Sequence, residues 1–230
     1  MQASTKTNLA IVGMGRWGEV LVRSVQGISD TTAFKAVVSR SPERVGSLAS
    51  DLGLSVLPDL AAALSDSSID GIVITTPHSS HADAIAECRR AGRPVLVEKP
   101  FTLTRSSAEA ALAQGDGLAL AAHNRRFLPS AVALHKAIQD GVLGDVLHIE
   151  ANFSGNMVGR YKDGMWRSDD TESPAGGLAG SGIHMIDLII GLAGSIESVY
   201  AMSSRRVAEL PIDDTMAAFF RLESGASAVL

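Results

Sequence analysis

The sequence is poor in features that mark several classes of protein. It has one cysteine, Cys88, among 230 residues, so a disulfide within the chain is excluded and a reducing compartment is expected. The polar N-terminus leads into an apolar stretch that breaks at Gly13, too short for a signal-peptide core or a membrane span. These features predict a soluble, cytoplasmic protein that has no membrane partner.

The net charge and the aromatic content narrow the possible classes of protein further. The formal net charge is -5 and no run of Lys or Arg forms a basic patch, so nucleic acid is not an expected partner. Aromatic residues make up 4% of the chain, whereas hydrophobic residues make up 46%. A core of small aliphatic side chains suits helices that pack closely on a parallel sheet.

The first half of the sequence alternates short apolar runs with helical patterns. Strands are expected at "NLAIV", "AFKAVVS", "DGIVIT", "PVLV" and "GLALAA". Helices are expected at "RWGEVLVRSVQG", "SPERVGSLASDLG", "SSHADAIAECRRAG" and "RSSAEAALAQG", the second of them capped by Ser41. Because the apolar runs are continuous and each is followed by a helix, residues 1–125 are predicted to form an α/β, doubly wound parallel sheet of the Rossmann type.

The pattern changes after about residue 125. Helices are expected at "PSAVALHKAIQDG" and "SGIHMIDLIIGLAG", and longer strands at "DVLHIEANFSG", "ESVYAMSSR" and "TMAAFFRLESGASAVL", with a hairpin turn at "ESGA". Residues 126–230 are therefore predicted to form an α+β domain with an open, largely antiparallel sheet. A sheet that ended at "GASAVL" would expose an apolar edge, so we expect either a longer chain, of which this domain is a truncated part, or a dimer that covers the sheet.

A glycine-rich motif, "GMGRWG", directly follows the first expected strand. Gly13, Gly15 and Gly18 have the G-x-G-x-x-G spacing, with Arg16 and Trp17 between the last two. Between a strand and a helix this spacing indicates a dinucleotide site, because the glycines permit a tight turn, a close approach of pyrophosphate and close packing of the helix. The helix N-terminus then faces the phosphates.

The end of the second expected strand bears on which dinucleotide binds. An acidic residue there would hold a ribose hydroxyl, but the sequence reads "VVSRSPER", with no carboxylate before Glu43. The hydroxyl of Ser39 and the guanidinium of Arg40 suit a 2'-phosphate, so NADP is favoured over NAD. The alternative is a solvated arginine in a loop.

Two further stretches, read together with the glycine motif, carry a family resemblance that runs from about residue 9 to residue 200. They are "TTPHSSHADAIAECRRAGRPVLVEKPFTLT" and "AHNRRFLPS". With "VGMGRWG" they make the sequence resemble the glucose-fructose oxidoreductase, inositol dehydrogenase and MocA family. The resemblance implies an NAD(P)-dependent dehydrogenase or reductase that acts on a sugar, a polyol or a related hydroxy or oxo compound, and a second domain that supplies substrate contacts and a homo-oligomer interface.

The resemblance also assigns residues to roles. Lys99 matches the family's active-site lysine, and His184 matches a histidine that faces the substrate, so both are predicted to be catalytic. The other matched or neighbouring residues are predicted to bind cofactor (Thr76, Pro77, His81, Glu98 and Lys99) or substrate (Asn124, Arg125, Trp166 and Asp187). A salt bridge of Lys99 with Glu98, a helix-start role of His81 and a core pair of His184 with Asp187 are the purely structural alternatives.

One position departs from the family pattern. Many relatives carry an aspartate four residues before the histidine, where this sequence has Gly180. The departure leaves open a nucleotide-binding sensor or regulatory protein without turnover, and a glycosidase that uses a nicotinamide transiently. The six histidines are dispersed, so no metal site is predicted, and the sequence identifies neither the substrate nor the direction of the reaction.

Overall fold

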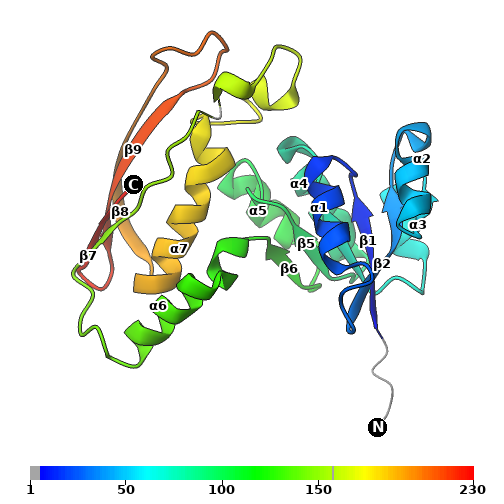
Figure 1. Ribbon diagram of the computed structural model, residues 1–230, viewed down its shortest axis with the longest axis horizontal. Helices are drawn as coiled ribbons and strands as arrows, with labels where there is room; N and C mark the ends of the chain where they lie inside the picture. The colour runs from blue at the N-terminus through cyan, green and yellow to red at the C-terminus, as the bar shows by residue number, and fades with distance from the viewer. Residues whose placement is uncertain (1–5, 157) are drawn as a thin grey trace. The chain divides into compact units, whose positions relative to one another are not determined.

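The computed structural model describes residues 6–156 and 158–230 (Figure 1). The chain divides into two compact units, Met1–Ala122 and His123–Leu230. Each unit has its own sheet and its own hydrophobic core, so each is described separately. Within the described ranges, no helix combines the length and the apolar character needed to cross a membrane.

The described part of the first unit holds a six-stranded sheet in the order β3-β2-β1-β4-β5-β6. All of its pairings are parallel. The strands are β1 (Thr7–Val12), β2 (Thr32–Val38), β3 (Ser55–Leu57), β4 (Gly71–Ile74), β5 (Val95–Val97) and β6 (Ala119–Ala121). The order reverses between β1 and β4, as in dinucleotide-binding doubly wound folds, which confirms the predicted fold class of this half.

Helices cover both faces of this sheet. They are α1 (Arg16–Val25), α2 (Pro42–Asp51), α3 (Leu60–Ser65), α4 (His81–Arg90) and α5 (Arg105–Leu112). Neighbouring strand residues point to opposite faces: Ile11 packs with Val22 of α1, whereas Ala10 packs in the cluster that contains Ile85 of α4. Both faces of the strands are therefore buried, which is why their apolar runs are continuous.

The first unit differs from the sequence prediction in three places. The strand β3 and the helix α3 were not predicted, although Asp59 caps α3 by accepting a hydrogen bond from the backbone N–H of Ala62 at 2.8 Å. Ser41 occupies the N-cap position of α2, but its side chain makes no capping hydrogen bond among the described residues. The prediction therefore places the N-cap of α2 at the right residue, but the described structure shows no hydrogen bond from the Ser41 side chain to the helix.

In the described part of the second unit, four strands form a sheet in the order β7-β10-β9-β8. They are β7 (His148–Glu150), β8 (Ile196–Ser204), β9 (Thr215–Leu222) and β10 (Ser227–Val229). β10 pairs with β7 in parallel and with β9 antiparallel, and β8 pairs with β9 antiparallel. The sheet is thus mixed, with antiparallel pairs in the majority, and the hairpin predicted at "ESGA" joins β9 to β10.

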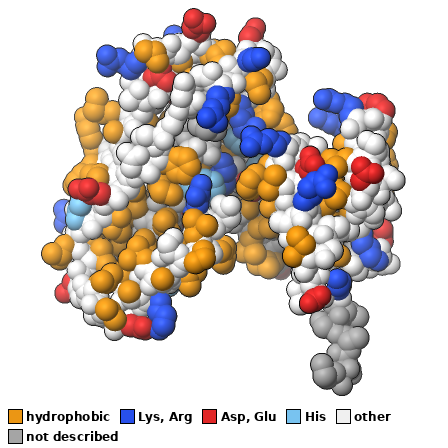
Figure 2. Space-filling model, in the orientation of Figure 1, with side chains coloured by type: hydrophobic (Ala, Val, Ile, Leu, Met, Phe, Trp, Pro, Cys, Tyr) orange, Lys and Arg blue, Asp and Glu red, His pale blue; other side chains and the backbone are white. Residues whose placement is uncertain are grey.

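The helices of the second unit are α6 (Pro129–Gln139) and α7 (Ile183–Ala193), the latter entered through a π-helical turn (Leu178–Gly182). α7 packs on one face of the sheet, where Ile189 meets Phe220 and Leu222 in a buried cluster. Hydrophobic side chains gather on the surface over α6 and the segment after it, where Val132 and Val142 are exposed (Figure 2). α7 therefore supplies the core of this unit, and α6 keeps an apolar surface.

Candidate active site

The predicted cofactor residues follow the carboxyl ends of four neighbouring strands. Gly13, Gly15, Arg16, Trp17 and Gly18 follow β1; Ser39 and Arg40 follow β2; Thr76, Pro77 and His81 follow β4; Glu98 and Lys99 follow β5. The carboxyl ends of parallel strands share one edge, and ligands of doubly wound sheets bind there. The structure therefore brings all of these residues to one edge of the first sheet.

The glycine-rich turn is shaped so that a phosphate can approach its backbone. Gly13 has φ +92°, in the region that favours glycine, and its carbonyl accepts a hydrogen bond from the hydroxyl of Thr75. A Cβ added at Gly18 would lie 2.5 Å from the Gly13 oxygen, whereas one added at Gly15 would meet nothing within 4 Å. Gly15 is also the N-cap of α1, and no described side chain caps that helix. The open space and the backbone N–H groups at this helix end fit a dinucleotide pyrophosphate.

Ser39 and Arg40 stand at the next strand end along the same edge. Ser39 is half-buried, and its hydroxyl oxygen accepts a hydrogen bond from the backbone N–H of Ser41 at 3.2 Å. The Arg40 side chain is exposed. The pair thus places a hydroxyl and a guanidinium beside the start of α2.

Side chains from two other elements hold the turn that carries Lys99. The indole Nε1 of Trp17 donates to Oε1 of Glu98 at 2.6 Å. The ring of His81, which is fully buried, lies with Nδ1 2.9 Å from the Pro100 oxygen and Nε2 3.1 Å from the Thr76 oxygen. Lys99 itself is partly buried between these two anchored neighbours. The structural alternative for His81 was a role at the start of a helix. His81 is indeed the first residue of α4, but its ring contacts the loop after β4 at Thr76 and the loop after β5 at Pro100.

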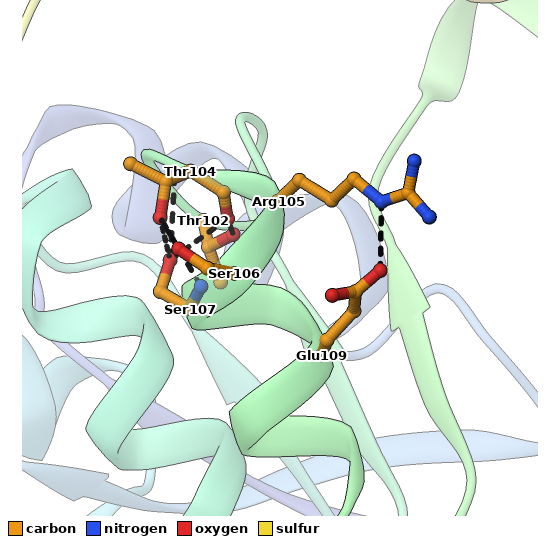
Figure 3. A network of polar contacts seen from close by, with 6 residues as sticks. All are labelled: Thr102, Thr104, Arg105, Ser106, Ser107 and Glu109. Carbon is orange, nitrogen blue, oxygen red and sulfur yellow. Dashed lines mark hydrogen bonds and ion pairs between the residues drawn. The ribbon is translucent and has the colours of Figure 1, made fainter.

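A network of hydroxyl groups fixes the end of the same loop (Figure 3). Thr104 caps α5: its hydroxyl accepts from the backbone N–H of Ser107 at 3.1 Å, and its own N–H donates to the Ser107 hydroxyl at 3.3 Å. The hydroxyl of Thr102 donates to the Thr104 oxygen at 2.7 Å. Such a reciprocal cap fixes the direction in which the chain enters a helix, so the segment after Lys99 has a defined end point.

Glu98 is electrostatically unusual in this environment. Burial raises the pKa of its carboxyl group, and the hydrogen bond from Trp17 and the nearby ammonium of Lys99 only partly oppose that rise. The carboxylate therefore forms at an energetic cost. Carboxyl groups with perturbed pKa values are common at functional sites, and Glu98 directly precedes the predicted catalytic Lys99.

The raised pKa of Glu98 predicts a pH-dependent stability difference between the protein and its Glu98→Gln variant. At pH values between the ordinary and the raised pKa, the folded state binds more protons at this group than the unfolded state does. The free energy of unfolding of the protein, relative to the variant, should therefore fall as pH rises above about 4.5. It should then level off above the folded-state pKa.

Urea unfolding at a series of pH values measures this difference. Glu109→Gln changes an exposed carboxylate that pairs with Arg105, and it controls for the loss of a surface charge. A difference between protein and Glu98→Gln that stays constant from acidic to neutral pH would show that burial does not disfavour the charge.

His184 and Asp187 lie on α7 in the second unit, in a cluster of charged side chains. Arg126 holds both carboxylate oxygens of Asp187, through Nε to Oδ2 and Nη2 to Oδ1, each at 2.7 Å. His123 Nδ1 lies 3.9 Å from the same Oδ2, and the rings of His123 and His184 meet edge to face at 6.1 Å. Asp187 thus forms a bidentate ion pair with Arg126, and the structural alternative that pairs it with His184 stays untested. Sequence reasoning missed His123 and Arg126, although both lie in the motif "AHNRRFLPS".

The other predicted substrate residues are spread over the second unit. Arg125 stacks on the ring of Phe153, with its guanidinium carbon 5.3 Å from the ring centroid, and Asn124 is exposed beside it. Trp166 is half-buried under the guanidinium of Arg167, 4.0 Å from the ring centroid. The Arg125 contact reaches a residue after β7 and the Trp166 contact is to the next residue in sequence, and these contacts do not by themselves form a substrate pocket.

Two further features of the second unit bear on the site. A Cβ added at Gly180 would lie 3.7 Å from the hydroxyl of Tyr161, so a polar group faces the position where a carboxylate was expected in relatives. A pocket of about 460 Å³ opens between the loop after β7, the π-helical turn and β9. None of Asn124, Arg125, Trp166 or Asp187 lines it. Across the described residues, no group of three or more His, Cys, Asp or Glu side chains could hold a metal ion.

Two family models match the chain, one for each unit. Residues 7–120 match the oxidoreductase family with an NAD-binding Rossmann fold, and residues 131–230 match the GFO/IDH/MocA C-terminal domain. Together the two models cover both sheets described above.

Curated proteins with related sequences agree with these models. One is an uncharacterized oxidoreductase, C115.03, of Schizosaccharomyces pombe, 33% identical over 173 residues, which are 73% of this chain and 45% of the relative. Another is the inositol 2-dehydrogenase of Rhizobium meliloti, 35% identical over 140 residues, which are 59% of this chain and 42% of the relative. The chain thus spans less than half the length of these curated relatives.

Solved structures show the same fold. A candidate oxidoreductase from Desulfitobacterium hafniense is 24% identical to the chain and superposes with a TM-score of 0.90, over 98% of this chain and 66% of that one. A likeness at this identity establishes the fold, and the two family models establish the lineage. The resemblance seen in the sequence is confirmed: the chain belongs to the GFO/IDH/MocA family of oxidoreductases.

Proposed function

We propose that the protein is an NAD(P)-dependent oxidoreductase that moves a hydride between a nicotinamide cofactor and a sugar, a polyol or a related hydroxy or oxo compound. The observation that carries the proposal is the shared edge of the first sheet, where the open glycine-rich turn follows β1 and the anchored Lys99 turn follows β5, with only β4 between the two strands. The inositol 2-dehydrogenase activity in the name of the Rhizobium meliloti relative supports the substrate class.

The proposed cofactor is NADP in preference to NAD. Gly13, Gly15 and Gly18 would hold the pyrophosphate, with Arg16 and Trp17 in the first turn of α1 beside it. Thr76 and Pro77 line the loop after β4 that would pass beside the nicotinamide. Ser39 and Arg40 favour a 2'-phosphate, because they offer donors where a ribose-binding carboxylate is absent from the described loop.

Lys99 and His184 are the proposed catalytic residues, one in each unit. A bound nicotinamide supplies a carbon that can accept or release a hydride. The Lys99 ammonium donates a hydrogen bond to the substrate oxygen and stabilises negative charge that develops on it. The imidazole of His184 accepts the proton of a substrate hydroxyl in oxidation and returns it in reduction, a role that histidine side chains commonly fill in catalysis.

The substrate contacts are proposed to come from the second unit. Asn124, Arg125 and Trp166 present amide, guanidinium and indole groups, all of which can hydrogen-bond or stack on a carbohydrate. Asp187 contributes through Arg126, because both of its carboxylate oxygens are already held by that side chain. A homo-oligomer in the cytoplasm completes the proposal. Its oligomeric part is supported by exposed apolar residues of β8 and β9 such as Tyr200 and Phe219.

The function is tested with a panel of sugars, polyols and their keto derivatives. Each compound is incubated with the protein and either the NADP or the NAD cofactor pair, and the absorbance of the reduced nicotinamide is followed. We expect turnover with at least one panel member and tighter binding of NADPH than of NADH. Arg40→Asp should reverse the cofactor order, because it removes a guanidinium from the phosphate and places a carboxylate where it can bind ribose. The loss in NADPH affinity should be about tenfold or more, the effect of one hydrogen bond to a charged group.

A matched control is Arg90→Asp, which makes the same charge change on an exposed residue at the far end of α4. It should leave the cofactor order unchanged. Equal affinities of the unaltered protein for NADPH and NADH would contradict the phosphate role of Ser39 and Arg40. Tight NADPH binding without turnover on any panel member would favour a sensor, and hydrolysis of a glycoside with retained cofactor would favour a glycosidase.

A further inference from the structure

The glycine-rich turn and the Lys99 turn are joined by a side-chain hydrogen bond. Trp17 lies in the first turn of α1, and its indole N–H donates to the Glu98 carboxylate at 2.6 Å across 81 residues of sequence. An indole N–H can only donate, and an ionised carboxylate can only accept, so the direction of this bond is fixed. Hydrogen bonds to charged groups are shorter and stronger than neutral ones. The contact therefore links the place proposed for pyrophosphate to the residue that precedes Lys99.

The residue that follows Lys99 is held by a side chain of another helix, α4. His81 is fully buried at the start of α4, and its two ring nitrogens lie within hydrogen-bond distance of the carbonyl oxygens of Pro100 and Thr76. A buried ring wedged between two loops has little freedom to move. On the other side of Lys99, the backbone N–H of Glu98 donates to the Ile74 oxygen at 2.9 Å, so Trp17 holds the side chain of a residue whose backbone is already tied to the sheet.

We propose that Trp17 is a positioning residue for Lys99: its indole N–H fixes Glu98, and with Pro100 fixed by His81 it sets the orientation of the lysine relative to a cofactor bound at the glycine-rich turn. The inference rests on the proposed catalytic role of Lys99. Displacement of a catalytic group by about 1 Å can cost two orders of magnitude in rate, so a single hydrogen bond at this point is significant.

The kinetic test uses Trp17→Phe, which keeps an aromatic ring and removes the N–H. We expect kcat to fall about tenfold, the effect of one hydrogen bond to a charged group, while the Kd for NADPH changes by less than about threefold. Ser24→Ala also removes one exposed side-chain donor from α1, where the Ser24 hydroxyl donates to the Leu21 oxygen at 2.7 Å, and it should leave kcat unchanged. A Trp17→Phe protein with full kcat, or with weakened NADPH binding as its only defect, would overturn the proposal.

A double-mutant cycle separates positioning from an independent effect. If Trp17 acts through Lys99, Trp17→Phe should slow the protein but should add nothing to Lys99→Ala. Additive losses would overturn the positioning role while leaving the catalytic role of Lys99 intact. Full turnover of Lys99→Ala alone would instead remove the catalytic role of Lys99, and the positioning proposal with it.

Fluorescence tests the contact without reference to turnover. The sequence has two tryptophans, Trp17 and Trp166, so Trp166→Phe leaves Trp17 as the reporter. In that background, Glu98→Ala should shift the Trp17 emission because the indole loses its acceptor, whereas Glu98→Gln should largely preserve it because an amide oxygen still accepts. Identical emission from the Glu98→Ala protein and its parent would show that the indole does not bind Glu98.

Discussion

Replacing Lys99 with alanine is expected to lower turnover by about a hundredfold or more, the usual effect of removing one preorganised donor. Cofactor affinity should stay nearly unchanged, because the glycine-rich turn and the Ser39 side of the edge remain intact. The reason lies in the geometry of the turn, in which Lys99 is placed at the carboxyl end of β5 with both neighbours anchored. Steady-state kinetics and NADPH titration on the same preparation measure the two quantities.

Lys136→Ala is the matched control for this prediction. Lys136 is an exposed lysine of α6 that pairs with Asp140 at 2.6 Å, and its loss should leave turnover unchanged. If Lys99→Ala instead loses NADPH binding while turnover per bound cofactor is retained, Lys99 is a cofactor clamp and the proposed catalytic role is wrong. The two outcomes separate charge stabilisation from binding.

Most of the first unit could be predicted from sequence because its strands are buried on both faces. Their apolar runs are continuous, and each is followed by a helix of ten residues or so with a recognisable start or stop. The exceptions are β3 and α3, three and six residues long, which are too short for a periodic pattern to emerge. In the second unit, the strand predicted over "DVLHIEANFSG" is reduced to His148–Glu150, because β10 offers a partner over three residues.

The site was predictable as a set of residues but not as a set of contacts. Glycines, Ser39 and Lys99 could be placed at strand ends, and parallel topology then brings strand ends together. The bond between Trp17 and Glu98 spans 81 residues, and no local pattern encodes it. The bidentate ion pair of Asp187 with Arg126, 61 residues away, is likewise encoded by no local pattern.

Alanine substitutions at two glycines of the glycine-rich turn, Gly18 and Gly15, should distinguish an effect on the free energy of unfolding from an effect on NADPH affinity. A Cβ at Gly18 would lie 2.5 Å from the Gly13 oxygen and 3.0 Å from the Thr75 hydroxyl, and the first of these is backbone that cannot rotate away. Gly18→Ala is therefore expected to lower the free energy of unfolding by about 3 kcal/mol, the upper end for overpacking. NADPH binding should weaken as well, because α1 must shift from the strand that precedes it.

Gly15→Ala should weaken NADPH binding without a comparable loss of stability, and it is the control for Gly18→Ala because the chemical change is identical. An alanine at Gly15 meets no protein atom within 4 Å, and the weaker helix cap is offset by a less flexible unfolded chain, so stability should change by less than about 1 kcal/mol. The same methyl group would occupy the space proposed for pyrophosphate, so NADPH affinity should fall about tenfold or more, as when a hydrogen bond to a charged group is lost. Urea unfolding without cofactor and NADPH titration test both variants. Unchanged NADPH affinity in Gly15→Ala would mean that the pyrophosphate does not approach this turn, and the dinucleotide site would then have to lie elsewhere.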